Sequence, residues 1–414
     1  MLLATPELET HAQYVEQGGY RPLADSEALL QSVRSAGLLG RGGAAFPLAV
    51  KLATVRAAGV GGCDTVVLAN GEEGEPASIK DRWLLRHRPH LVLDGLRLAA
   101  HVIGARHAHL YVSDPAAART VRAALSEVPG RDDGGLGGVA VSIRTVRPGY
   151  VAGEETAAVR AVNGGPAKPT DKPPRPFEQG VGGLPTLVSN VETLANLPFI
   201  ARHGAGAYRQ AGTAASPGTF LATVTGGHQP PGLYELPHGV AVSDLLALHQ
   251  IPGEQVSGAL MGGYFAGLVG PEFLDATLDH ETMRALGSGL GCGAVSVLTD
   301  ECPVAVAASV LAYFDRENAG QCGSCFNGTA AMAAAAGALR DGAATDDDVD
   351  RLRRWSVVLR GRGACATLDA ATNIAASLLQ RFPAAVAGHL TGGCPDCGAT
   401  PFTAQRPFEV ETVR

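Results

Sequence analysis

The sequence predicts an α/β protein in three parts: an α/β domain, a small α+β module and a C-terminal bundle of helices. Between residues 22 and 197, apolar strand-like runs alternate with helix-like stretches, which is typical of an α/β layer. Short strand-like runs surround one helix-like segment between residues 219 and 297. From Pro303 onward, an alanine-rich sequence shows helical periodicity in four consecutive segments, which favours a bundle. We place the parts at residues 1–205, 215–297 and 300–385, followed by a cysteine-containing tail at residues 386–414.

The composition indicates a globular protein with a mildly acidic balance. The 414 residues include 33 basic and 40 acidic side chains, a formal charge of −7, whereas electrostatic binding to nucleic acid favours a basic surface. A hydrophobic fraction of 46% excludes disorder along the whole chain. The longest apolar runs, such as residues 304–313, fall short of the roughly 20 residues that span a bilayer. The first residues do not resemble an export signal, so we expect a cytoplasmic protein with no nucleic-acid partner and no direct membrane insertion.

The first candidate site is a glycine-rich loop, GLLGRGGAAFP, at residues 37–47. Its glycines allow backbone N–H groups to approach a phosphate that side chains would otherwise block. A tight turn without a ligand explains the glycines equally well. However, Arg41 offers an anion-pairing fork, Phe46 a stacking surface and Lys51 a point charge. The combination favours a nucleotide.

Two acidic motifs add hydrogen-bond acceptors. NGEEGEP at residues 70–76 follows an apolar strand-like run and so lies at a strand's carboxyl end, where open α/β sheets bind ligands. YVAGEET at residues 150–156 combines a glycine with two further carboxylates. An exposed acidic turn is the alternative for the first motif. Its position after a buried strand favours acceptors for ribityl or ribose hydroxyls instead.

A long segment rich in proline and glycine, residues 164–184, is either a linker or a ligand-binding loop. The motif VSNVET at residues 188–193 follows it and resembles the start of a helix, with Ser189 or Asn190 as the cap. The free N–H groups of such a helix start are suited to a phosphate.

Because the first residues do not resemble an export signal, the eight cysteines are expected to be metal ligands, catalytic groups or buried residues rather than disulfides. Cys322 and Cys325 form a CxxC pair, and with the remote Cys365 they make a soft-metal signature. Cys394 and Cys397 form a second CxxC pair that alone suggests a zinc knuckle, and the two pairs together are one possible zinc site. The other cysteines lie in or beside apolar stretches and are expected to be buried, inert thiols: Cys63, Cys292 and Cys302.

In this order, the motifs GRGGAAFP, NGEEGEP with KDR, GYVAGEET, LPTLVSNVETL and GQCGSC with Cys365 resemble the FMN- and NADH-binding flavoprotein subunit of respiratory complex I. They equally resemble its relatives in NAD-reducing hydrogenases and formate dehydrogenases. The resemblance extends over residues 22–382. It implies a Rossmann-like FMN-binding domain, a ubiquitin-like β-grasp module of the SLBB type and a four-helix bundle that carries a [4Fe–4S] cluster.

The resemblance and the motifs together name the candidate site residues. The resemblance implies FMN contacts at Gly40, Gly42, Lys51, Asn70, Glu72, Gly153, Glu154, Ser189, Asn190 and Thr193. It implies NAD(H) or NADP(H) contacts at Gly43, Phe46, Glu75, Glu155 and Lys172. Further cofactor-binding candidates from the same motifs are Arg41, Glu73, Tyr150 and Val188.

The chain departs from the family pattern at four positions. Glu72 stands where aspartate is usual, and Thr54 and Arg175 stand where aromatic rings are common. Ala319 replaces one cluster cysteine. The remaining possibilities are a [3Fe–4S] cluster, a mononuclear site that uses both CxxC pairs, or a [4Fe–4S] cluster completed by the tail at Cys394 or Cys397. We expect the last of these.

The function implied is that of a flavoprotein subunit of the NAD(P)H dehydrogenase, or diaphorase, type. Electrons pass from a nicotinamide nucleotide through FMN to the iron–sulfur cluster, and then to a ferredoxin-like or [2Fe–2S] partner protein. No side chain need act as a general acid or base, because the flavin carries the hydride chemistry. One alternative is an electron relay that no longer binds NADH, and another is a flavin-free scaffold with structural zinc.

Overall fold

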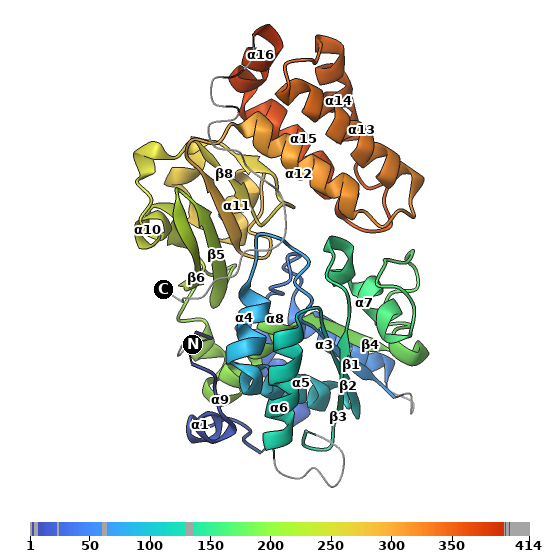
Figure 1. The fold of residues 1–414 in the computed structure, drawn as a ribbon. Coiled ribbons are helices and arrows are strands. Elements are labelled where there is room, and N and C mark those ends of the chain that lie inside the picture. The colour runs from blue at the N-terminus through green and yellow to red at the C-terminus, as the bar shows by residue number, and fades with distance from the viewer. Residues whose placement is uncertain are drawn as a thin grey trace.

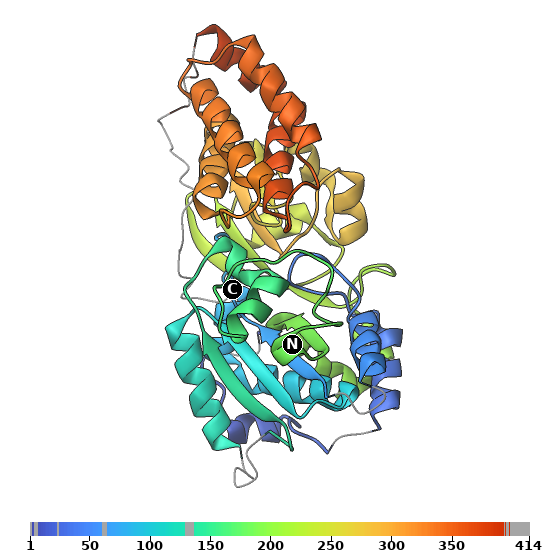
Figure 2. The ribbon, with the colours of Figure 1, turned by 90° about the vertical axis from the view of Figure 1, so that its right-hand side faces the viewer.

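The computed structural model describes residues 2–3, 7–22, 25–59, 64–128, 136–392, 394 and 397, so Cys63 lies outside the described residues. The N-terminal α/β domain occupies one end of the molecule and the C-terminal helices the other, with a second sheet between them (Figures 1 and 2). This arrangement is a mixed α/β fold with a helical C-terminal region, as the sequence predicts. None of the described helices combines the length and apolar character needed to cross a membrane.

The N-terminal domain is built on a four-stranded parallel sheet in the order β3-β2-β1-β4. Because all four strands run the same way, their carboxyl ends meet at one edge of the sheet. The chain adds β2 and β3 on one side of β1 but β4 on the other, so the order of the strands reverses between β1 and β4. In open α/β sheets, such a reversal is where ligands bind. The strands are β1 (Val66–Asn70), β2 (His107–Val112), β3 (Ala140–Thr145) and β4 (Thr186–Asn190).

Helices cover both faces of this sheet, and α5 is buried along nearly its whole length. At Gly95 of α5, an added Cβ would lie 2.1 Å from the carbonyl oxygen of Leu194, so only glycine permits this close packing against α8. The helices of the domain are α1 (His11–Glu16), α2 (Ser26–Ala36), α3 (Leu48–Ala58), α4 (Lys80–His87), α5 (Pro89–Ile103), α6 (Pro115–Glu127), α7 (Glu155–Val162), α8 (Val191–Ala195) and α9 (Leu197–Tyr208), with short 3₁₀ turns η2 (Tyr150–Gly153) and η3 (Val181–Gly183).

The middle part contains a five-stranded mixed sheet in the order β6-β5-β11-β8-β9. Strand β11 runs parallel to β5 and antiparallel to β8, which places the last strand of this part at the centre of the sheet. The sequence predicts one helix here, and the structure adds a second, α11. The elements are β5 (Thr219–Gly226), β6 (Gln229–Pro237), β7 (Val240–Ala241), α10 (Val242–Leu248), η4 (Gly253–Gln255), β8 (Gly258–Met261), β9 (Leu268–Val269), η5 (Pro271–Asp275), β10 (Thr277–Leu278), α11 (His280–Ala285) and β11 (Ala294–Leu298).

The C-terminal part has five helices among the described residues, not the four that the sequence pattern predicts. The helical pattern breaks at Phe382, where the backbone leaves the helical region, and Pro383 begins a further short helix. The helices are α12 (Pro303–Glu317), α13 (Gly323–Arg340), α14 (Asp346–Val358), α15 (Thr367–Arg381) and α16 (Pro383–Thr391). Their shared core is apolar, with fully buried residues such as Phe314, Met332 and Ile374.

A buried histidine, His238, and a half-buried one, His280, lie near the junction of the N-terminal domain and the middle sheet. The His238 ring stacks on Phe220 with 4.7 Å between ring centroids, and the His280 ring lies 5.2 Å away from it. Neither ring nitrogen of His238 has a hydrogen-bond partner among the described residues. Burial, with a smaller contribution from Arg41, lowers the pKa of His238 to about 2 and that of His280 to about 4. Both histidines are therefore neutral in the folded protein at physiological pH.

These histidines predict a specific loss of stability in acid. Because their folded pKa values lie below the unfolded value, the stabilisation is complete above about pH 6.5 and is lost as the pH falls toward those values. Each histidine steepens the dependence by at most about 1.4 kcal/mol per pH unit. We expect His238→Phe, which retains the stacking, to show a smaller fall in thermal midpoint between pH 7 and pH 5. The exposed His228 lies outside this pair, so His228→Asn serves as the control variant. An unchanged slope in His238→Phe would remove His238 from this explanation.

Candidate functional site

The candidate site lies at the carboxyl ends of β1 and β4, where the strand order reverses. Asn70 and Asn190 end these strands and are paired in register. The Asn190 side chain donates to the Asn70 carbonyl oxygen at 3.4 Å, and the Asn70 side chain donates to the Gly153 carbonyl oxygen at 2.8 Å. Three motifs that are far apart in the sequence, at residues 70–76, 150–156 and 188–193, therefore meet at one place.

The glycine-rich loop closes over the same place. The backbone N–H of Arg41 donates to Thr193 Oγ1 at 2.8 Å, which ties the loop to the segment after β4. A Cβ on Gly42 would lie 3.2 Å from the Asn190 Cβ, so the loop backbone approaches the strand end closely. At Gly43, φ is +114° and an added Cβ would meet nothing within 4 Å. The loop thus has one side packed on the protein and one side open, as a cradle for a phosphate requires.

Lys51 supplies a cation beside this loop. It lies in the first turns of α3 and is half-buried, and its Nζ donates to the Val188 carbonyl oxygen at 3.2 Å. Burial lowers the pKa of Lys51, while the Glu155 carboxylate opposes that shift. An ammonium group that has lost part of its hydration is stabilised by a bound anion. The position therefore fits the phosphate of FMN.

Two residues expected to contact the cofactor have internal roles instead. Arg41 is 4% exposed, and its guanidinium donates to Tyr208 OH at 3.0 Å and to the Thr219 carbonyl oxygen at 2.9 Å. These partners occupy the fork that was expected to pair with an anion. Glu73 is 5% exposed and accepts from Ser78 Oγ at 2.6 Å and from the first backbone N–H groups of α4. Glu73 therefore caps α4: the buried carboxylate needs hydrogen-bond donors, and the unpaired N–H groups at the start of the helix supply them.

The other acids of the two acidic motifs are held by specific donors. Glu72 accepts from Ser113 Oγ at 2.7 Å and from the Gly149 N–H at 3.1 Å. Glu154 caps α7 and lies 2.7 Å from Lys172 Nζ, which also pairs with Glu155 at 3.3 Å. These carboxylates hold the pKa of Lys172 above its usual range, against the opposing effect of burial. Lys172 therefore stays charged and connects the long 164–184 segment to the site.

The remaining predicted residues lie in mixed environments. Ser189 is buried in β4, and Phe46 is 47% exposed with Lys51 Nζ 6.0 Å from its ring centroid. The Tyr150 ring packs edge-on against Phe314 of α12, so it links the domain to the C-terminal helices. Glu75 lies against Gly263 of the middle part, where a Cβ would come within 2.1 Å of its carboxyl carbon.

A buried ion network beneath the site escaped sequence reasoning. Lys80 is 1% exposed, and its Nζ lies 2.7 Å from Asp81, 2.9 Å from Glu192 and 3.3 Å from Asn190 Oδ1. These carboxylates raise the pKa of Lys80 despite its burial. The network holds the Asn190 side chain and so positions the end of β4. The sequence feature that could have indicated this network is the adjacent opposite charges of Lys80 and Asp81 at the start of a mostly buried helix, α4.

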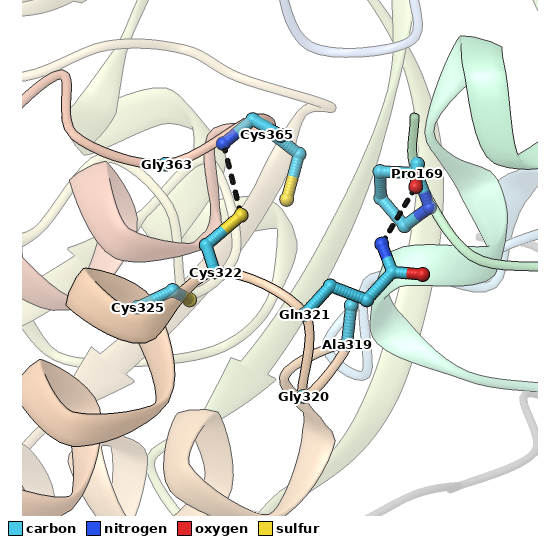
Figure 3. Close-up of a pocket in the computed structure, with 9 residues that line it drawn as sticks. Pro169, Ala319, Gly320, Gln321, Cys322, Cys325, Gly363 and Cys365 are labelled. Carbon is cyan, nitrogen blue, oxygen red and sulfur yellow. Dashed lines mark hydrogen bonds between the residues drawn. The ribbon is translucent and has the colours of Figure 1, made fainter. Parts of the chain in front are cut away.

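Three cysteines line a pocket at the junction of α12, α13 and α15. The sulfur atoms of Cys322, Cys325 and Cys365 face the same space (Figure 3). Burial, together with the two neighbouring thiols, raises the pKa of Cys325 to about 12. Thiols gathered in this way oppose one another's ionisation, whereas a positively charged metal centre favours the thiolates. The donor set therefore fits an iron–sulfur cluster.

The cysteine pocket also faces the N-terminal domain. Pro169, from the long 164–184 segment, forms part of its wall, and its carbonyl oxygen accepts from Gln321 Nε2 at 2.7 Å (Figure 3). Lys168 Nζ donates to the Ala319 carbonyl oxygen at 2.7 Å. The segment that the sequence leaves open as a linker or a ligand loop thus joins the candidate FMN site to the cysteine pocket.

Cys394 and Cys397 do not lie at this pocket. They gather with Cys302 and His389 at the other end of the bundle, and the four ligand atoms lie within 4.8 Å of one another. Helix α12 separates Cys302 from the Cys322 pocket by its 15 residues, or about 22 Å of rise. The structure therefore contradicts completion of the cluster by the tail and a zinc site shared by both CxxC pairs. Cys302 is buried, as expected, and its Sγ lies 3.2 Å from His389 Nε2, whereas Cys292 is half-buried and its Sγ lies 3.8 Å from the Gly262 carbonyl oxygen.

Comparisons with known proteins support both candidate centres. Residues 33–199 match the model of the Nuo51 FMN-binding domain, and residues 305–389 match that of the NADH-ubiquinone oxidoreductase-F iron–sulfur binding region. These matches confirm the family resemblance that the motifs indicate.

Individual proteins that are similar to this chain in sequence or structure indicate the same family. An NADH-quinone oxidoreductase subunit of Rhizobium meliloti is 31% identical and aligns with 93% of this chain and 95% of its own length. The NADP-reducing hydrogenase subunit HndC of Solidesulfovibrio fructosivorans is 29% identical, over 98% of this chain and 85% of its own. A crystal structure of an NAD⁺-reducing [NiFe]-hydrogenase in the H₂-reduced state matches with a TM-score of 0.80 and 32% identity over 89% of this chain, which spans 63% of the hydrogenase chain. The chain therefore belongs to the family of FMN-binding, iron–sulfur-binding subunits of NADH-quinone oxidoreductase.

Proposed function

We propose that the chain is a flavin-dependent oxidoreductase subunit that transfers electrons from a nicotinamide nucleotide through FMN to an iron–sulfur cluster and on to a partner protein. The observation that carries this proposal is the joining of two candidate centres by one segment. The loop that holds Lys172 beside the candidate FMN site also forms a wall of the cysteine pocket at Pro169. A short route between a flavin and a cluster is what electron transfer requires.

The site residues would bind FMN without covalent or acid–base chemistry. Bound FMN accepts a hydride as an electron pair and releases electrons singly. The open loop backbone at Gly42 and Gly43, with the Lys51 ammonium, would bind the phosphate. Asn70 and Glu72, fixed by their own hydrogen bonds, would set the position of the ribityl chain. The remaining FMN contacts that the family pattern implies are also part of this proposal: Gly40, Gly153, Glu154, Ser189, Asn190 and Thr193. Val188 remains a further candidate, and its carbonyl oxygen accepts from Lys51 Nζ.

The nucleotide would lie on the exposed side of the loop. Phe46 is the exposed ring beside Lys51, and Glu75, Glu155 and Lys172 supply polar groups around the same opening. Arg175 is exposed and Thr54 is half-buried. Neither residue has an aromatic ring on which the nucleotide base can stack. We propose that nucleotide binding depends on Phe46 for its aromatic contact.

The cluster would be a [4Fe–4S] cluster held by three thiolates. Cys322, Cys325 and Cys365 supply them, and Ala319 lines the pocket where the family has a fourth cysteine. Because Cys394 and Cys397 lie elsewhere, the fourth iron would have a ligand other than a thiolate of the described residues. We also propose that residues 215–297 form a β-grasp module of the SLBB type and that residues 300–385 contain the cluster bundle.

Anaerobic titration with NADH and with NADPH tests the function. We expect either nucleotide to bleach the flavin absorbance of the purified holoprotein, followed by reduction of the cluster. Phe46→Ala should raise the KM for the nucleotide about twofold to tenfold, because a lost stacking contact costs about 0.5–1.5 kcal/mol. Leu248→Ala, which truncates an exposed apolar residue of α10, is the matched control and should leave KM unchanged. A flavin that neither nucleotide reduces, but that a reduced ferredoxin does, would establish the relay instead.

A further inference from the structure

We propose that Cys302, His389, Cys394 and Cys397 bind one zinc ion that fastens the C-terminal tail to the start of α12. The four ligand atoms lie within 4.8 Å of one another, and His389 Nε2 is 3.2 Å from Cys302 Sγ and 3.5 Å from Cys397 Sγ. In a tetrahedral zinc site, neighbouring sulfur and nitrogen ligands lie about 3.5–3.8 Å apart. The donors are thus nearly at the spacing that a single ion imposes.

The fold supplies these ligands from three separate places. Cys302 precedes the first residue of α12, His389 lies in the last turn of α16, and the CxxC pair belongs to the tail. Cys302 and His389 are 3% and 2% exposed, so these two ligands form the buried side of the site. Cys302 is the N-cap residue of the 15-residue α12, so the N–H groups at the start of that helix lie beside its metal-bound sulfur. Three thiolates and a neutral imidazole are a common structural zinc ligand set.

The spacing favours a single metal ion over a second iron–sulfur cluster. In a cluster the protein ligands are distributed over two or more irons, which holds ligands of different irons farther apart than ligands of one ion, whereas these four atoms all lie within 4.8 Å of one another. The site lies at the end of the bundle that is remote from α7, and the cluster pocket lies at the end that meets the N-terminal domain (Figure 1). All the sulfur atoms of the site belong to free cysteines.

The location indicates what the ion would do. Cys302 follows β11 (Ala294–Leu298) by four residues, so the site lies where the chain passes from the middle sheet into the bundle. One zinc ion there would join the sheet–bundle junction, α16 and the tail. Structural zinc sites contribute directly to folding stability. The role is mechanical and does not depend on the proposed electron transfer.

Metal analysis of the full-length holoprotein tests the inference. We expect about one zinc per chain in addition to the cluster iron, and a zinc K-edge absorption spectrum that fits three sulfur ligands and one nitrogen ligand. Cys394→Ser/Cys397→Ser should retain less than about a tenth of that zinc while keeping its iron, sulfide and flavin. Cys292→Ser is the matched control, because Cys292 lies outside both metal sites, and it should keep the zinc.

The outcomes separate this site from the cluster. Cys325→Ser should lose iron and sulfide but keep zinc, which is the reverse of the tail variant. The zinc K-edge spectrum is measured on the wild-type protein, so this part of the test does not depend on whether a variant folds. Wild-type protein without zinc, a spectrum with four sulfur ligands, or a double variant that retains its zinc would each overturn the proposal, whatever the flavin and the nucleotide do.

Discussion

Cys325→Ser protein is expected to lose its iron–sulfur cluster, with iron and acid-labile sulfide at about a tenth of the wild-type content or less. Cys325 lies in the first turn of α13, is 7% exposed and faces the same pocket as Cys322 and Cys365. With Ala319 in the fourth place, only three thiolates of the described residues are available. A serine oxygen is a poor ligand for iron in such a cluster, and the two remaining thiols cannot hold it.

The flavin provides the internal reference for this experiment. The Cys325→Ser protein should retain FMN and remain reducible by the nucleotide, because the candidate flavin site contains no residue of α13. Its electron paramagnetic resonance signal after dithionite reduction should be absent. Cys292→Ser tests for a general effect of removing a thiol and should keep the cluster. Wild-type iron and an unchanged spectrum in Cys325→Ser would show that the pocket does not hold the cluster.

Lys51→Ala is expected to weaken FMN retention about tenfold to a hundredfold. A hydrogen bond to a charged group contributes about 1.5–3 kcal/mol, and each 1.4 kcal/mol is a factor of ten in affinity. Lys51 fits this role because its half-buried ammonium lies at the carboxyl end of β4 beside the open glycine loop. The dissociation constant for FMN, measured by fluorescence after reversible removal of the flavin, is the quantity to compare.

Arg56→Ala is the matched control for Lys51→Ala. It removes a positive charge from the same helix, but Arg56 pairs with Glu27 at 2.9 Å on the surface of α2 and α3. This variant should bind FMN with wild-type affinity. If Lys51→Ala keeps full flavin occupancy through extended dialysis, Lys51 does not bind the phosphate, and of the two proposed phosphate contacts only the glycine-loop backbone would remain.

The meeting of the flavin motifs was predictable because of how parallel sheets are built. The apolar run before Asn70 marks a buried strand, and all strands of a parallel sheet end at the same edge. Motifs that follow such strands therefore come together without any knowledge of side-chain contacts. The same reasoning does not predict the internal partners of Arg41 and Glu73, because an arginine and a glutamate in these motifs suit a nucleotide site as well as an internal contact. Their burial and internal partners depend on the packing of α4 and α9, which no local pattern encodes.

The sequence alone determined the family, the N-terminal α/β domain, the C-terminal helices and the three cysteines that line the pocket proposed for the cluster. These features are local or ordered along the chain, so periodicity, glycine spacing and CxxC motifs reveal them. Only the tertiary structure decided where the tail cysteines lie and which residues join them. Cys302 and His389 are 87 positions apart, and they meet because α12 and α16 pack against one core. Such contacts result from the burial of apolar surface, and this driving force has no preferred direction. No short sequence motif therefore predicts which ligands come together.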